Sequence, residues 1–131
     1  HIRVPFVTRV CVVLSRYRTA VALPNVTRVR CGSAHGIGHF NVQKYLAGDH
    51  FARLHSERTS IGTLHRIFAW MTYLNDVEDG GTTDFDYYKV KIKPEVGKTL
   101  IWPAEWTHAH TGSVLKSGSK YIVTGWMHFT D

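Results

Sequence analysis

From residue 40 onward, short apolar runs alternate with turn signals, and this pattern constrains the fold more than any other feature of the sequence. Strands are predicted at residues 40–46, 66–74, 87–93, 98–102 and 120–129. The stretch from Asn75 to Gly81 is a strong turn signal, whereas residues 49–65 are polar and predict an irregular loop. Strands this short and numerous are typical of a β-sandwich or a β-barrel, so the chain is predicted to be mainly β.

The first 39 residues differ from the rest of the chain in charge. They contain six arginines and no acidic residue, whereas residues 40–131 contain ten basic and ten acidic residues, so the net charge of +6 lies in the first segment. We therefore divide the chain into a basic N-terminal segment, residues 1–39, and one domain, residues 40–131. Apolar side chains at helical spacing within residues 9–23 predict a minor N-terminal helix, and residues 32–38 predict a loop.

Composition narrows the classes of function. No apolar run reaches the roughly 18 residues that a membrane span needs, and no signal peptide is visible, so a cytoplasmic protein without a membrane partner is expected. Two cysteines are too few for a disulfide framework, so a metal site is expected from among the nine histidines. The arginines of the basic segment lack a clear accompanying pattern of aromatic residues, which argues against nucleic acid as a partner.

Two potential metal ligands, His55 and Glu57, lie two residues apart. On an extended segment, residues i and i+2 point to the same side, so an imidazole and a carboxylate there can bind one ion together. His108 and His110 offer a third ligand about 50 residues later. Two histidines and one carboxylate occupy one face of an octahedral ion and leave positions open for a co-substrate and oxygen, as in non-haem Fe(II) oxygenases. The same ligands could hold Zn(II) and a water for hydrolysis, and His-x-Glu taken alone is a weak signal.

Further motifs lie before, between and after these candidate ligands. In chain order they are Tyr45-x-x-Gly48-x-x-Phe51, YLNDV at residues 73–77, GGTTDF at residues 80–85, and Gly118-x-Lys120 after His110. With these motifs, residues 41–129 resemble the prolyl 4-hydroxylase-like branch of the Fe(II)- and 2-oxoglutarate-dependent dioxygenases, and the pattern is closest to small stand-alone members from bacteria and phages. The resemblance implies a double-stranded β-helix, or jelly roll, whose mouth holds the iron.

The resemblance also implies a role for each candidate site residue. The iron ligands would be His55, Glu57 and His110, and His110 is preferred to His108 because of its spacing to the motif that follows. Lys120 would pair with the distal carboxylate of 2-oxoglutarate, since a cation at the base of a narrow barrel needs an anionic partner. The other residues expected to line the co-substrate pocket are Tyr45, Tyr73, Thr83 and Trp126.

By this resemblance the protein is expected to be an enzyme, a dioxygenase that hydroxylates an organic substrate while 2-oxoglutarate is decarboxylated to succinate and CO₂. The implied cofactors are Fe(II), the co-substrate 2-oxoglutarate and O₂, with ascorbate as an optional addition. The expected partner is a small-molecule or peptide substrate, with peptidyl proline as the first candidate. The alternative is a catalytically inactive β-barrel that binds nucleic acid or another acidic partner through its basic N-terminal segment.

The metal-binding motif departs from the family pattern in one respect. The family usually has His-x-Asp, whereas this chain has His55-Ser56-Glu57, placed one residue later than usual after Tyr45-x-x-Gly48. Glutamate is one methylene longer, so the ion or the backbone must shift to keep a metal–oxygen distance of about 2.0–2.2 Å. The extra residue can compensate, so we interpret the motif as a variant that binds iron.

Overall fold

The computed structural model describes the backbone of residues 9–12, 21–23 and 35–129 and the side chains of residues 39–129. Its strands are β1 (Arg9–Val12), β2 (Val21–Leu23), β3 (His35–Leu46), β4 (Arg66–Tyr73), β5 (Thr83–Phe85), β6 (Val90–Ile92), β7 (Lys98–Pro103), β8 (His110–Gly112) and β9 (Ser119–Phe129). Two 3₁₀-helices of one turn each, η1 (Ile61–Thr63) and η2 (Trp106–His108), also lie in this described part. None of its helices is long and apolar enough to cross a membrane.

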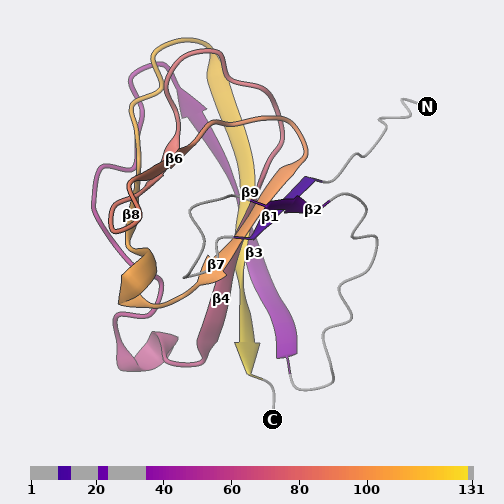
Figure 1. The fold of residues 1–131 in the computed structure, drawn as a ribbon, viewed down its shortest axis with the longest axis vertical. Helices are drawn as coiled ribbons and strands as arrows, with labels where there is room; N and C mark the ends of the chain where they lie inside the picture. The colour runs from indigo at the N-terminus through magenta and orange to yellow at the C-terminus, as the bar shows by residue number, and fades with distance from the viewer. Residues whose placement is uncertain (1–8, 13–20, 24–34, 130–131) are drawn as a thin grey trace, which may run out of the picture.

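The strands form two sheets that lie on either side of a common core (Figure 1). The larger sheet has the order β2-β1-β7-β4-β9-β3, and the smaller sheet has the order β6-β5-β8. All pairings are antiparallel except that of β1 with β7, which is parallel. Most neighbouring strands come from distant parts of the chain, such as β3 beside β9, as in a jelly roll. The predicted double-stranded β-helix is therefore confirmed.

The core lies between the two sheets because alternate side chains of a strand point to the same face. In β4 the inward-pointing residues Ala69, Met71 and Tyr73 are all buried. The other buried hydrophobic residues of the cluster are Phe85, Ile92, Leu100, Trp102 and Ile122. Both sheets contribute to this cluster, so it fixes β4 and β9 relative to the small sheet that carries β8.

The predicted N-terminal helix is wrong where the structure describes it, because Arg9–Val12 and Val21–Leu23 are strands. β1 pairs with β2 on one side and with β7 on the other. The β-branched side chain of valine has few allowed rotamers in a helix and packs well on a pleated sheet. Pairing with β7 therefore decides the structure of this segment, although its apolar residues are spaced as in a helix. The rest of the predicted helix lies outside the described residues.

The loop predicted at residues 32–38 is wrong from His35 onward, since β3 begins there. His35 pairs with Phe129 of β9, and this long-range pairing outweighs the weak strand preference of the glycines. The register shifts between Ile37 and Phe40, as at a β-bulge. The predicted division of the chain between residues 39 and 40 falls within β3 and stays a prediction.

The remaining predicted strands are confirmed, with ends that differ by a residue or more. The strand predicted at residues 87–93 is shorter and covers only Val90–Ile92. Residues before it form a turn in which the Lys89 amide donates to the carbonyl oxygen of Asp86 at 3.3 Å, and Lys89 has a φ of 54°. The loop predicted at residues 49–65 is confirmed, apart from the single turn of η1.

Candidate metal centre and co-substrate pocket

A short backbone bridge brings His55 and His110 side by side. The His55 amide donates to the His110 carbonyl oxygen at 3.2 Å, and the His110 amide donates to the His55 carbonyl oxygen at 2.9 Å. The two imidazole rings consequently lie with their centres 4.3 Å apart. Glu57 follows two residues after His55, and its own amide donates to the carbonyl oxygen of Ala104 at 3.2 Å. A loop and the start of β8 are thus fixed to each other at this site.

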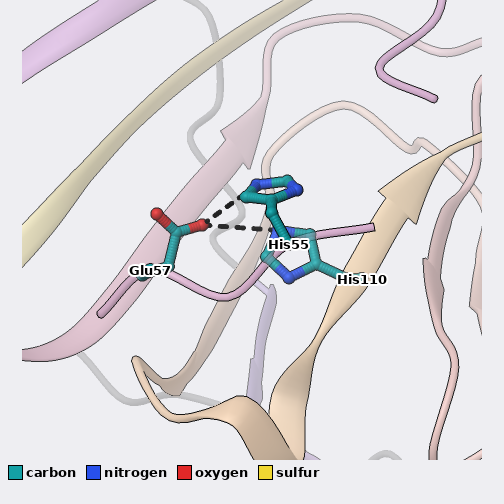
Figure 2. Close-up of side chains that lie close together, drawn as sticks. All are labelled: His55, Glu57 and His110. Carbon is teal, nitrogen blue, oxygen red and sulfur yellow. Dashed lines mark ion pairs between the residues drawn. The ribbon is translucent and has the colours of Figure 1, made fainter. Parts of the chain in front are cut away.

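The side chains of His55, Glu57 and His110 converge on one point (Figure 2). Glu57 Oε1 lies 3.6 Å from His55 Nε2 and 3.4 Å from His110 Nε2, and the three candidate ligand atoms all lie within 4.8 Å of one another. Adjacent ligands of an octahedral ion with bonds of about 2.1 Å lie roughly 3 Å apart. The three residues can therefore hold a single metal ion after a small contraction.

Hydrogen bonds on the far side of each imidazole prepare these rings to bind a metal. His55 Nδ1 lies 2.9 Å from the carbonyl oxygen of Arg53, and His110 Nδ1 lies 2.9 Å from the carbonyl oxygen of His108. A carbonyl oxygen can only accept, so Nδ1 is the protonated donor in each neutral ring. The lone pair of each Nε2 is then left for an ion, as in most histidine metal sites.

The Glu57 carboxylate is charged although only 11% of its side chain is exposed. Burial raises its pKa, but hydrogen bonds from His110, His55 and Trp126, together with the charge of His110, outweigh burial and hold the pKa well below its usual range. The hydrogen bond to Glu57 is also the main cause of a raised pKa at His55. A divalent cation bound by the two imidazoles would balance the charge of this carboxylate, so the donor set fits a divalent ion.

A cavity of about 260 Å³ opens beside these three residues and reaches Lys120. Only 5% of Lys120 is exposed, its Nζ donates to the carbonyl oxygen of Gly81 at 3.0 Å, and burial lowers its pKa. The Tyr45 ring lies 4.5 Å from Nζ. Among the described residues, no carboxylate lies within 4.0 Å of this ammonium group. The cavity therefore joins a metal-binding cluster to a buried cation that has no carboxylate partner in the described part of the chain.

The other predicted pocket residues occupy two different positions. Tyr45, Thr83 and Trp126 line the cavity. Burial, with the nearby charge of Asp49, raises the pKa of Tyr45, and its hydroxyl donates to Gln43 Oε1 at 2.6 Å. Tyr73 is fully buried behind the cavity, where its hydroxyl lies 2.6 Å from Thr83 Oγ1. Tyr73 can therefore orient the Thr83 hydroxyl without lining the cavity.

His108, the alternative third ligand, lies outside the metal-binding cluster. Its ring lies 4.9 Å from that of Tyr88 and 6.3 Å from that of Phe85, and Nδ1 lies 2.9 Å from Thr107 Oγ1. Its carbonyl oxygen accepts the hydrogen bond from His110 that is described above. The structure thus places His110, and not His108, at the point where His55 and Glu57 meet.

Sequence reasoning missed several residues of the cavity wall. Those on β3 and β9 are Asn41, Gln43, Ile122 and Thr124. Each lies an even number of residues from Tyr45 or from Lys120, so the alternation of a strand would have placed them on the same face. The wall residues Phe51, Met71, Trp102 and Thr111 come from other elements, and the predicted motifs gave no such signal for Met71, Trp102 and Thr111.

A jelly roll that contains two histidines and one carboxylate around an open position defines the class of mononuclear non-haem metal sites. The family model of the 2OG-Fe(II) oxygenase superfamily matches residues 40–128, and this chain belongs to that family. The predicted resemblance to its prolyl 4-hydroxylase-like branch is also confirmed by the relatives. Members of this family use Fe(II), 2-oxoglutarate and O₂, which agrees with the donor set and the buried lysine.

Curated relatives and solved structures are similar to parts of the chain. Prolyl 4-hydroxylase subunit alpha-1 from Gallus gallus and from Homo sapiens are each 27% identical over an alignment of 75 residues, and the match covers 52% of this chain and 14% of theirs. The viral collagen prolyl hydroxylase of Paramecium Bursaria Chlorella virus-1 has a TM-score of 0.64 at 24% identity, over 77% of this chain and 64% of that one. A Pseudomonas putida prolyl-4-hydroxylase has a TM-score of 0.57 at 20% identity, over 73% and 56%. These structures share the fold.

Proposed function

We propose that this chain is an Fe(II)- and 2-oxoglutarate-dependent hydroxylase. The observation that supports this most directly is the single cavity shared by His55, Glu57, His110 and the buried Lys120. With iron and 2-oxoglutarate bound, the site would supply oxidation of a substrate C–H bond by O₂, coupled to decarboxylation of 2-oxoglutarate to succinate and CO₂. The chain itself would bind, orient and shield the reactants.

Each part of the cavity has a distinct task in this proposal. Nε2 of His55, Nε2 of His110 and Oε1 of Glu57 would hold the iron. Lys120 would bind the distal carboxylate of 2-oxoglutarate, since a buried ammonium group gains most from an anion that shares its desolvated site. Apolar wall residues, Met71 among them, would exclude water from the reacting atoms.

For the substrate we propose a proline residue within a peptide, and for an optional reductant we propose ascorbate. The names of the relatives, which include prolyl 4-hydroxylase subunit alpha-1 and a viral collagen prolyl hydroxylase, support the choice of proline. A proline-rich peptide and the same peptide with alanine at each proline would test it. We expect the first to gain the mass of one oxygen and the second to stay unchanged.

Succinate release tests the reaction itself. The full chain should form succinate only when Fe(II), 2-oxoglutarate and O₂ are all present, and a lack of succinate under these conditions would refute the proposal. Lys120→Met should raise the KM for 2-oxoglutarate at least about tenfold, because a charge-assisted contact is lost. Lys116→Met is the matched control, since Lys116 is exposed, pairs with Asp79 and lies outside the cavity. Equal KM values for the two variants would contradict the role of Lys120.

The alternative of an inactive binding module depends on the basic N-terminal segment. Five of its six arginines lie outside the described residues, and only the backbone of Arg9 is described. Such a module would not need the three candidate metal ligands or the buried lysine. The proposed hydroxylase accounts for both.

A further inference from the structure

Glu57 is the ligand whose position needs the most support, because its side chain is longer than the aspartate usual in the family. Two groups other than the histidines contact it through hydrogen bonds. Trp126 Nε1 donates to Glu57 Oε2 at 2.7 Å, which leaves Oε1 directed at the histidines. Arg66 Nη1 donates to the Glu57 carbonyl oxygen at 3.1 Å. One group thus fixes the carboxylate and the other fixes the backbone.

Arg66 also contacts the tryptophan that fixes the carboxylate. Its guanidinium carbon lies 3.7 Å from the centre of the Trp126 ring, which is the geometry of a cation–π contact. The contact follows from the sheet register, since Arg66 of β4 pairs with His128 of β9 and Trp126 lies two residues from His128 on the same strand. Residues two apart on a strand share a face, so the two side chains meet.

The charge of Arg66 has no other partner within the described part of the chain. No carboxylate there lies within 4.0 Å of its guanidinium group, and its Nε is buried without a hydrogen bond. A planar guanidinium can stack on a ring and donate in its own plane at the same time, as it does here.

We propose that Arg66 is a positioning residue for the metal centre, which holds Glu57 both through its backbone carbonyl group and through the Trp126 indole. This inference rests on the proposed function in so far as it requires a divalent metal at His55, Glu57 and His110. Arg66 itself contacts neither the metal position nor the co-substrate cavity. Its loss should therefore loosen the carboxylate without removing any ligand.

Metal binding can be measured apart from turnover. Co(II) is titrated into the metal-free full chain, and both the affinity and the absorption spectrum of the bound ion are recorded. We expect Arg66→Ala to weaken binding about tenfold and to alter the spectrum, because loss of a group that orients a ligand has this effect in metal sites. Arg66→Lys should recover part of the affinity, since an ammonium group can donate to the carbonyl oxygen and lie over the ring.

The matched control is Arg58→Ala. Arg58 is next to Glu57 in the sequence and is also part-buried, but its side chain contacts Leu64 and Glu105 instead of Trp126. We expect this variant to bind Co(II) like the wild type. An equal loss of affinity in both variants would show that any change in this loop weakens the site, and it would overturn the specific role of Arg66.

A double substitution tests the route through the indole. Trp126→Phe keeps a ring for stacking but removes the N–H donor, so it should itself weaken Co(II) binding. The effect of Arg66→Ala should be clearly smaller in the Trp126→Phe background than in the wild type. An effect of full size in both backgrounds would overturn the proposed route.

Two outcomes separate this inference from the proposed function. Wild-type affinity and an unchanged spectrum in Arg66→Ala would refute the role of Arg66, whatever the activity of the wild type. A wild type that binds Co(II) but releases no succinate with Fe(II) would refute the hydroxylase alone. If Arg66→Ala does not fold, Arg66→Gln takes its place, because glutamine keeps a donor but has no charge. Weaker binding by Arg66→Gln supports the inference, and wild-type binding refutes it.

Discussion

At the scale of single residues, the ligand set is defined by what each side chain does with its second polar atom. His55 and His110 each bind a backbone carbonyl oxygen through Nδ1, and Glu57 accepts from Trp126 through Oε2. The remaining atom of each side chain points to a common centre. The longer side chain of Glu57 is therefore compatible with the site, because Trp126 fixes its outer oxygen.

Substitutions of the two candidate third ligands, His108 and His110, should differ in their effect on metal binding. His110→Ala removes one of three ligands and should abolish Co(II) binding at micromolar metal. His108→Asn should bind Co(II) within about threefold of the wild type, because the Nδ1 contact of His110 is to the backbone carbonyl group of residue 108. Titration of both variants, after each is shown to be folded by circular dichroism, checks this. Loss of binding only in His108→Asn would reverse the assignment.

Metal affinity should fall as the pH falls. A histidine binds a metal only when Nε2 is unprotonated, so protons and metal compete for it. The hydrogen bond to Glu57 raises the pKa of His55, so the competition begins above the ordinary histidine value of about 6.5. Between about pH 8 and pH 6 the dissociation constant for Co(II) should therefore rise, by up to tenfold per pH unit for one competing proton. A dissociation constant that does not change over this range would contradict the proposed ligands.

At the scale of elements, the length of a strand decides what could be predicted from the sequence. The apolar runs of β4 and β9 are long enough to show a pattern, and both were predicted. β5 and β8 have three residues each and show none, although β8 begins with the ligand His110. The motif spacing predicted His55, Glu57 and His110, but only the fold shows that a backbone bridge joins His55 to β8. Long-range pairing likewise accounts for β1, which local periodicity predicted as a helix.

The turn before β5 should be more sensitive to substitution than the turn before β9. Gly80 and Gly118 both have a positive φ, of 76° and 71°. A Cβ on Gly80 would overlap the carbonyl oxygen of Val114, whereas a Cβ on Gly118 would have nothing within 4 Å. Gly118→Ala should therefore lower the free energy of unfolding by about 1 kcal/mol, from backbone strain alone.

Gly80→Ala should lower the free energy of unfolding by about 3 kcal/mol. Here a clash of the new Cβ with backbone atoms is added to the strain of a positive φ. Urea unfolding of both variants provides the comparison. Gly81, the next residue, provides the carbonyl group that binds Lys120, so Gly80→Ala should also raise the KM for 2-oxoglutarate. Equal losses of stability in the two variants would contradict the close packing of this turn.

At the scale of the whole molecule, the site lies where the two sheets and the loop before His55 meet. The segment before His55 is an irregular loop, and backbone bonds hold it to the region of β8, such as those from the Gly112 amide to Phe51 and from the Leu115 amide to Asp49. The larger sheet carries Lys120 and Trp126, and the smaller sheet carries His110 and Thr83. A ligand that fills the cavity would therefore contact both sheets and the loop at once.

Metal binding should for this reason stabilise the molecule as a whole. A ligand that binds only the folded state adds about 2.7 kcal/mol when its concentration is a hundred times the dissociation constant. For a chain of this size, Co(II) at that excess should raise the Tm by roughly 10 °C, and a chelator should reverse the effect. Amides of the loop around Glu57 should also exchange more slowly with solvent, because the ion ties this loop to β8. His110→Ala should show neither effect, and a Tm that rises equally in this variant would place the stabilising ion elsewhere on the protein.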